Sequence, residues 1–191
     1  MLSLKLYEER NLKVKPGIVS FIERKDNISG FQAAILIASS RSFSGTRKDL
    51  TGPALEKRLK QLNYSVISIR IIPDDQQSII SAFRELIQSD KANLIIISGG
   101  TGLSPDDVTP EATAQVIEKR IPGMEEAMRR ESLKITPHAM LSRAVVGTAG
   151  KSLIINLPGN PKGALENLHV IEPASEGKVF SRSITSTTRR L

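Results

Sequence analysis

The sequence contains no cysteine among its 191 residues and only two histidines, His138 and His169. The chain therefore has no disulfide, no thiolate zinc site and no cysteine nucleophile, and two isolated histidines do not predict a transition-metal site. Tryptophan is also absent, and aromatic residues make up only 4% of the chain. The hydrophobic fraction of 39% is nevertheless sufficient for the core of one sizeable domain.

Long hydrophobic runs are missing too, both a membrane-spanning segment and the apolar stretch of a signal peptide. We therefore expect a cytoplasmic protein with no membrane partner. The net charge of +7 raises the question of nucleic acid. However, no basic run is interleaved with aromatic residues, and no helix-turn-helix or zinc-finger pattern occurs. We predict no nucleic-acid partner, because a mildly basic surface also suits a small anionic substrate.

What the sequence does contain is a strand pattern followed by a glycine-rich loop, Leu94-Ile-Ile-Ile-Ser98-Gly-Gly-Thr-Gly102. The apolar, β-branched run is typical of a buried strand. Glycines there allow positive φ and close approach of a ligand to the backbone. A helix start follows, with Thr109 as the expected N-cap and Pro110 at the first helical position. Loop and helix start together favour an anion.

Acidic residues accompany this predicted anion site. Asp106 and Asp107 lie in the same loop, and Asp49 and Asp74 follow two other predicted strands. A carboxylate repels a phosphate unless a cation lies between them, so the pattern indicates Mg²⁺. Each of these aspartates could instead have a local structural role. Asp74 has capping-box spacing with Gln77, Asp107 fits a helix cap or a turn, and Asp49 fits a turn.

Predicted strands and helices alternate along the chain. We expect strands near residues 33–38, 66–72 and 94–98, helices near 49–63, 76–89 and 111–120, a second helical piece to about 131 after an interruption at 121–123, paired strands near 144–148 and 152–157, and a helix capped by Asn160. This alternation predicts an α/β fold with three α/β/α layers, in which a mostly parallel sheet has helices on both faces. Ligands bind beyond the carboxyl ends of such strands, so loops 39–49, 73–75, 99–107 and 158–160 should converge.

The two ends of the chain lack this pattern. We assign residues 1–30 to an N-terminal extension with a short strand at 18–22, residues 31–172 to the domain, and residues 173–191 to a poorly ordered tail. Two phosphate-binding motifs are incomplete: Gly150-Lys-Ser152 lacks the first Walker A glycine and precedes a strand, and Gly100-Thr-Gly102 lacks the third glycine of a dinucleotide fingerprint.

A series of motifs over residues 33–170 carries a family resemblance. They are Asp49-Leu-Thr-Gly-Pro53, Ile72-Pro-Asp-Asp75, Gly99-Gly-Thr-Gly102, Asp107-Val-Thr-Pro-Glu-Ala-Thr113, Pro122-Gly123, Ser132-Leu-Lys-Ile-Thr-Pro137, Ala139-Met-Leu-Ser-Arg143 and Leu157-Pro-Gly-Asn-Pro161. Together they resemble the molybdenum-cofactor biosynthesis domain of molybdopterin adenylyltransferases and of the gephyrin G-domain type. The chain departs from that pattern at Ser40, where relatives commonly have Asp, and at Thr51, where they commonly have Ser.

This resemblance implies Mg²⁺-dependent transfer of AMP from ATP to the terminal phosphate of molybdopterin, which releases pyrophosphate. It implies that Asp74 and Asp107 are the catalytic acids that hold Mg²⁺. It places Gly99, Gly100, Thr101 and Gly102 at the nucleotide phosphates, Ser132 and Ser142 on the molybdopterin side, and Pro158, Gly159 and Asn160 at the nucleotide end.

The resemblance also implies a homotrimer, and it leaves open whether a separate protein downstream inserts molybdate. Two other functions stay open at this point. One is a non-catalytic molybdopterin-binding scaffold, and the other is a Mg²⁺-dependent dinucleotide pyrophosphatase of the same fold. Asp74 and Asp107 argue against a purely structural role, because a scaffold has no need of two acids beside a phosphate loop.

Overall fold

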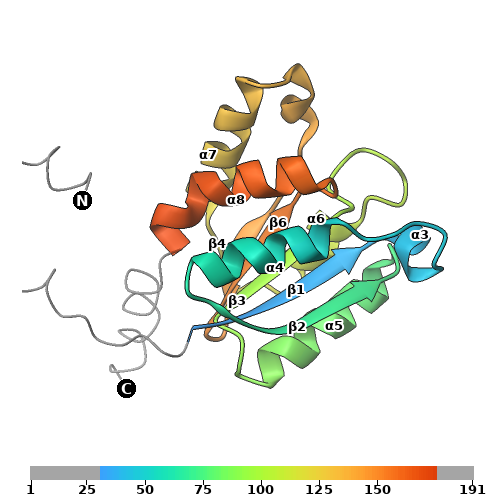
Figure 1. Ribbon diagram of the computed structural model, residues 1–191, viewed down its shortest axis with the longest axis vertical. Helices are drawn as coiled ribbons and strands as arrows, with labels where there is room; N and C mark the ends of the chain where they lie inside the picture. The colour runs from blue at the N-terminus through green and yellow to red at the C-terminus, as the bar shows by residue number, and fades with distance from the viewer. Residues whose placement is uncertain (1–30, 176–191) are drawn as a thin grey trace, which may run out of the picture.

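A six-stranded mixed sheet organises the computed structural model, which describes residues 31–175 (Figure 1). The strand order is β2 (Ser65–Ile72), β1 (Gln32–Ala38), β3 (Leu94–Ser98), β6 (Ser152–Leu157), β5 (Val146–Ala149) and β4 (Lys119–Arg120). Neighbours from β2 to β6 are parallel, whereas β5 and β4 are added antiparallel. The carboxyl ends of four strands therefore meet at one edge of the sheet.

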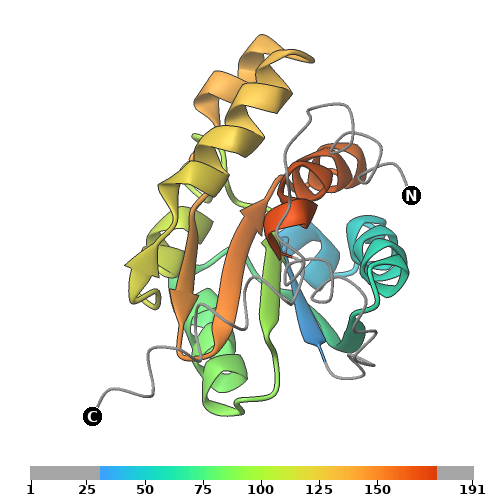
Figure 2. The same cartoon turned by 90° about the vertical axis from the view of Figure 1, so that its left-hand side faces the viewer.

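Helices cover both faces of this sheet (Figures 1 and 2). On one face lie α4 (Thr51–Gln61), α7 (Pro122–Leu133) and α8 (Pro161–Ser175), which bury Leu59, Met128 and Leu168 against the strands. On the other face lie α5 (Gln76–Gln88) and α6 (Thr109–Ala114), which bury Phe83 and Ala112. The predicted three-layer α/β/α fold is confirmed. Among residues 31–175, no helix has the length and apolar character needed to span a membrane.

Strand position explains the sequence patterns. β1 and β3 lie in the middle of the sheet and are covered on both faces, so they consist of continuous apolar runs. β2 lies at the edge, where its residues alternate between exposed and half-buried. Its sequence also alternates along most of its length, but in the opposite sense to its exposure: Ile67, Ile69 and Ile71 are the exposed residues, whereas Ser68 and Arg70 are half-buried.

The predicted helix at 111–120 is wrong in its second half. α6 ends at Ala114, and Lys119–Arg120 form the short strand β4. Nε and Nη2 of Arg120 each donate a 2.8 Å hydrogen bond to the buried carboxylate of Glu125, which also accepts a bond from the Val146 N–H. These tertiary contacts outweigh a modest local helix propensity.

Helix ends also differ in part from expectation. Thr109 is the first residue of α6 rather than its N-cap, and Val108 precedes the helix without a side-chain cap. The start of α8 is as predicted, because Asn160 Oδ1 accepts a 2.7 Å hydrogen bond from the Gly163 N–H. α8 continues to Ser175, past position 172 where we expected the domain to end. Residues 1–30, with the predicted strand at 18–22, and residues 176–191 lie outside the described part.

Candidate functional site

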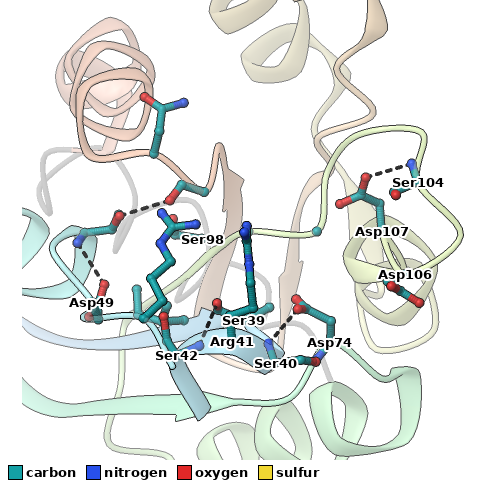
Figure 3. A pocket seen from close by; sticks show the side chains of 18 residues that line it. Ser39, Ser40, Arg41, Ser42, Asp49, Asp74, Ser98, Ser104, Asp106 and Asp107 are labelled. Atoms are coloured by element: carbon teal, nitrogen blue, oxygen red, sulfur yellow. Dashed lines mark hydrogen bonds between the residues drawn. The ribbon is translucent and has the colours of Figure 1, made fainter. Parts of the chain in front are cut away.

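The loops that follow β1, β2, β3 and β6 meet around one cavity of about 490 Å³ (Figure 3). This convergence is the one that the strand pattern predicts, and the volume lies in the range of small-ligand sites. The polar and glycine residues that line the cavity are Ser39, Ser40, Arg41, Ser42, Arg47, Asp49, Thr51, Asp74, Ser98, Gly99, Gly100, Ser104, Asp106, Asp107, Gly159 and Asn160.

Hydrogen bonds between neighbouring loops hold the rim of this cavity. The Ser39 N–H donates to the Ile72 carbonyl at 2.9 Å, which joins the loops after β1 and β2. The Ser98 hydroxyl donates to the Pro158 carbonyl at 2.7 Å, which joins the ends of β3 and β6. The Thr51 hydroxyl donates to the Gly159 carbonyl at 3.0 Å. The loops are thus pre-organised by contacts within the chain itself.

Asp74 belongs to the cavity and does not cap α5. Its Oδ2 accepts a 2.7 Å bond from the Ser40 N–H, and its own N–H donates to the Ser40 hydroxyl at 3.0 Å. The N-cap of α5 is Asp75, which accepts from the Ser78 N–H at 2.8 Å. Hydrogen bonds from the Ser78 hydroxyl and N–H lower the pKa of the Asp75 carboxyl. The predicted capping box of Asp74 with Gln77 is therefore wrong by one residue.

Asp107 has the turn role considered for it and lies at the cavity as well. Its Oδ2 accepts a 2.8 Å bond from the Ser104 N–H, so it orders its own loop, and it also lines the cavity (Figure 3). A Cβ at Gly102 would lie 2.8 Å from this same oxygen. Glycine at position 102 therefore makes room for the carboxylate, and the expected positive φ is not found there.

Gly99 is the position where the loop demands glycine most strongly. Its φ is +113°, and a Cβ there would lie 2.2 Å from the Ala38 carbonyl oxygen. The loop after β3 therefore passes so close to the end of β1 that only glycine fits at position 99. Gly100 also has a positive φ, of +61°, so the predicted conformational role of these two glycines is confirmed.

Arg143 is a residue whose contribution the motif did not reveal. Its Nε donates to the Gly102 carbonyl at 2.7 Å, and its other nitrogens bind the Asp107 carbonyl and the Glu111 carboxylate. Its backbone N–H also donates to the Thr101 carbonyl at 3.1 Å. One side chain therefore ties together both ends of the loop that carries Asp107. Arg143 and Asp107 are 36 residues apart in the sequence, so no local sequence pattern indicates this contact.

The remaining predicted residues are not among those that line the cavity. Thr101 and Gly102 belong to the loop after β3, and Pro158 belongs to the loop after β6. Ser132 accepts a 3.1 Å bond from the Asn167 side chain, which joins α7 to α8. Ser142 ends the 3₁₀ helix η1 (Pro137–Leu141), in the segment that projects beyond the sheet with α7 (Figure 1). The sequence analysis in turn did not single out Ser39, Ser42, Arg47 or Ser104, all of which line the cavity.

The acids of the cavity suit a cation that is shared with a ligand. Within residues 31–175, no three acidic or histidine side chains form a ready-made metal cluster. In both Asp74 and Asp107 one oxygen accepts a backbone hydrogen bond, and the other has no such bond within the described part. Mg²⁺ is commonly held by one or two carboxylates, with phosphate oxygens and waters completing its shell. The donor set fits that arrangement.

Known proteins share this fold and sequence. Residues 34–176 match the family model described as "Probable molybdopterin binding domain". The chain is 40% identical over 142 residues to the molybdopterin adenylyltransferase of Helicobacter pylori strain J99, covering 73% of this chain and 81% of that protein. It is 39% identical over 148 residues to the molybdopterin adenylyltransferase of Escherichia coli K12, covering 76% of this chain and 75% of that protein.

Solved structures agree with these sequence matches. The crystal structure of the molybdopterin biosynthesis enzyme MoaB from Thermus thermophilus superposes with a TM-score of 0.73 at 38% identity, covering 78% of this chain and 96% of that one. The molybdopterin biosynthesis Mog protein from Mycobacterium ulcerans superposes with a TM-score of 0.75 at 36% identity, covering 83% and 99%. The resemblance seen in the motifs thus extends over the whole described domain.

Proposed function

We propose a reaction for this chain on the premise that it belongs to the molybdopterin-binding domain family of molybdenum cofactor biosynthesis. The reaction is Mg²⁺-dependent transfer of AMP from ATP to the terminal phosphate of molybdopterin, which yields adenylyl-molybdopterin and pyrophosphate. The single observation that carries the proposal is the juxtaposition of Asp74 and Asp107 with the glycine loop around one cavity. Relatives at about 40% identity bear the name of this activity.

The chemistry requires positioning and charge neutralisation more than covalent catalysis. An oxygen of the molybdopterin phosphate attacks the α-phosphorus of ATP. The new P–O bond forms as the bond from the α-phosphorus to the bridging oxygen breaks, and pyrophosphate leaves with that electron pair. A phosphate monoester is already largely ionised at neutral pH, so the attacking oxygen needs no general base. This agrees with the described cavity lining, which includes no histidine.

Different residues of the chain would bind the phosphates, the Mg²⁺ ion and the two substrates. Gly99 and Gly100 let the backbone of the loop approach the nucleotide phosphates. Asp74 and Asp107 would hold Mg²⁺, which when bound neutralises phosphate charge during the transfer. Gly159 and Asn160 line the cavity from the β6 side and would contact the nucleotide. Ser132 and Ser142 would contact molybdopterin outside the cavity, near α7.

The test is an adenylyl-transfer assay with purified protein, molybdopterin, ATP and Mg²⁺. Asp107→Asn should lower the rate at least about a hundredfold, because a hard cation prefers an anionic oxygen and the transition state loses several kcal/mol of stabilisation. Asp90→Asn is the matched control. Asp90 has φ +51° in the turn after α5, where Asn is well tolerated, and it does not line the cavity. A normal rate for Asp107→Asn would contradict the assignment.

The same assay, run also with a dinucleotide in place of ATP and molybdopterin, separates the two other functions. A dinucleotide pyrophosphatase would hydrolyse the pyrophosphate bond of that dinucleotide to two mononucleotides without molybdopterin. A scaffold would bind molybdopterin and turn over no nucleotide. Pyrophosphate release that depends on both ATP and molybdopterin is the result expected here.

We also propose a homotrimer. The edge strand β2 supports an assembly, because Ile67, Ile69 and Ile71 are each 36–38% exposed along one of its faces. Burying apolar surface between subunits would stabilise a domain with few aromatic residues. Light scattering at micromolar concentration should give three times the chain mass of 20.9 kDa. A monomer mass would contradict this proposal.

A further inference from the structure

The loop between β1 and α4 brings two arginines together. The Arg41 carbonyl accepts three hydrogen bonds: from the Ser44 hydroxyl at 3.2 Å, from the Thr46 hydroxyl at 2.9 Å and from the Arg47 N–H at 3.0 Å. The last of these closes the loop, so that the backbones of Arg41 and Arg47 lie side by side. Both residues line the cavity. The pair is therefore built into the loop conformation.

Neither guanidinium has a partner within residues 31–175, although four carboxylates line the same cavity. The nearby acids are engaged elsewhere. Asp49 accepts from the Thr51 and Gly52 N–H groups at the start of α4. Asp74 accepts from the N–H of Ser40, the residue directly before Arg41. The guanidinium donors of both arginines are therefore free to bind a ligand in the cavity. Arg41 directly follows Ser40, the residue that binds Asp74, which is one of the acids assigned to Mg²⁺.

We propose that Arg41 and Arg47 form a clamp for the β- and γ-phosphates of the nucleotide. The planar guanidinium binds phosphate oxygens bidentately, and such charge-assisted bonds are about twice as strong as neutral ones. The clamp rests on the proposed function for its role in catalysis. The chemical class of its ligand, a pyrophosphate or triphosphate group, is inferred from the cavity, where two arginines and four aspartates line the same space.

The clamp also has a consequence for the reaction. When the bond to the α-phosphorus breaks, negative charge develops on the bridging oxygen of the departing pyrophosphate. Fixed positive groups at that end stabilise the developing charge. Arg41 and Arg47 would therefore bind the departing pyrophosphate. The Mg²⁺ ion held by Asp74 and Asp107 would neutralise charge on the transferred phosphate. AMP, which lacks the terminal phosphates, would bind without them.

Calorimetric titration of the full chain with inorganic pyrophosphate, ATP and AMP, each with Mg²⁺, tests the clamp. Arg41→Ala and Arg47→Ala should each weaken pyrophosphate and ATP binding at least about tenfold and AMP binding less than about twofold. Arg41→Lys should fall between, because lysine keeps the charge and loses the fork. Arg84→Ala is the control: Arg84 is an exposed arginine on α5 that does not line the cavity.

Three outcomes are decisive. If the loop variants bind pyrophosphate and ATP as tightly as Arg84→Ala does, the clamp is refuted, and continuing adenylyl transfer would leave the proposed function intact. Equal weakening of AMP and ATP would also refute it, because the arginines would then contact the α-phosphate or the sugar. If pyrophosphate binding depends on the arginines and no adenylyl-molybdopterin forms, the clamp stands and the proposed function fails.

Discussion

The adjacent residues Asp74 and Asp75 should have separable roles, although they are chemically identical and differ by one position. Asp75 Oδ1 accepts from the Ser78 N–H at 2.8 Å and caps α5. Asp74 Oδ2 accepts from the Ser40 N–H at 2.7 Å, and Asp74 lines the cavity. Substituting each residue in turn should therefore change either stability or catalysis, and not both.

The expected magnitudes follow from these contacts. Asp75→Ala removes a side-chain cap worth about 1 kcal/mol, which lowers the melting temperature by about 3 °C in a domain of this size and leaves adenylyl transfer unchanged. Asp75→Asn should be nearly neutral, because Asn caps as well as Asp. Asp74→Asn keeps an oxygen for the Ser40 N–H and loses the anionic metal ligand. It should cost little stability and lower the rate at least about a hundredfold.

The assay pairs a thermal unfolding curve with an initial rate of adenylyl transfer at saturating Mg²⁺ for each variant. Only Asp74→Asn should lower the rate of adenylyl transfer, and only Asp75→Ala should lower the melting temperature. A near-normal rate for Asp74→Asn would refute the metal assignment of this residue. An unchanged melting temperature for Asp75→Ala would show that its hydrogen bond to Ser78 contributes nothing to α5.

Three further substitutions follow from the structure. Gly99→Ala forces a Cβ against the Ala38 carbonyl at a position of positive φ, so it should lower the free energy of unfolding, measured in urea, by more than about 2 kcal/mol. Its control, Gly123→Ala, adds a Cβ in open space on α7 and should be close to neutral. Arg143→Ala releases the loop that carries Asp107 and should lower kcat more than about tenfold with a smaller change in KM, measured by steady-state kinetics. Burial disfavours the Glu172 carboxylate, but hydrogen bonds from Arg58 and His169 outweigh it and hold its pKa below the ordinary value of 4.5. Its stabilisation is therefore complete above that ordinary value and lost as the pH falls through the lower folded-state pKa, so Glu172→Gln should flatten the acid limb of the stability–pH curve.

Periodicity and loop composition were enough to predict the architecture. The apolar runs of β1 and β3 are typical of strands covered on both faces, and the alternation of strands with helices indicates a mainly parallel sheet. The edge at which ligands bind follows from that topology alone. Local chemistry likewise identified the start of α8, because Asn160 and Pro161 act within one turn of the helix.

Contacts between distant segments decided the rest. No local pattern tells which of Asp74 and Asp75 caps α5, because the choice depends on Ser40, which lies in another loop. The strand β4 exists because Arg120 binds Glu125 and pairs with β5, against its helical context.

The sequence by itself thus determined which loops surround the cavity, since strand ends and glycines are local features. Only the tertiary structure decided how they are held. The contacts of Arg143 with the Asp107 loop are hydrogen bonds between segments 36 residues apart, and Arg41 and Arg47 are brought together by a hydrogen bond that forms only when their loop closes. Such bonds depend on distances across the folded chain, and a one-dimensional pattern does not contain them.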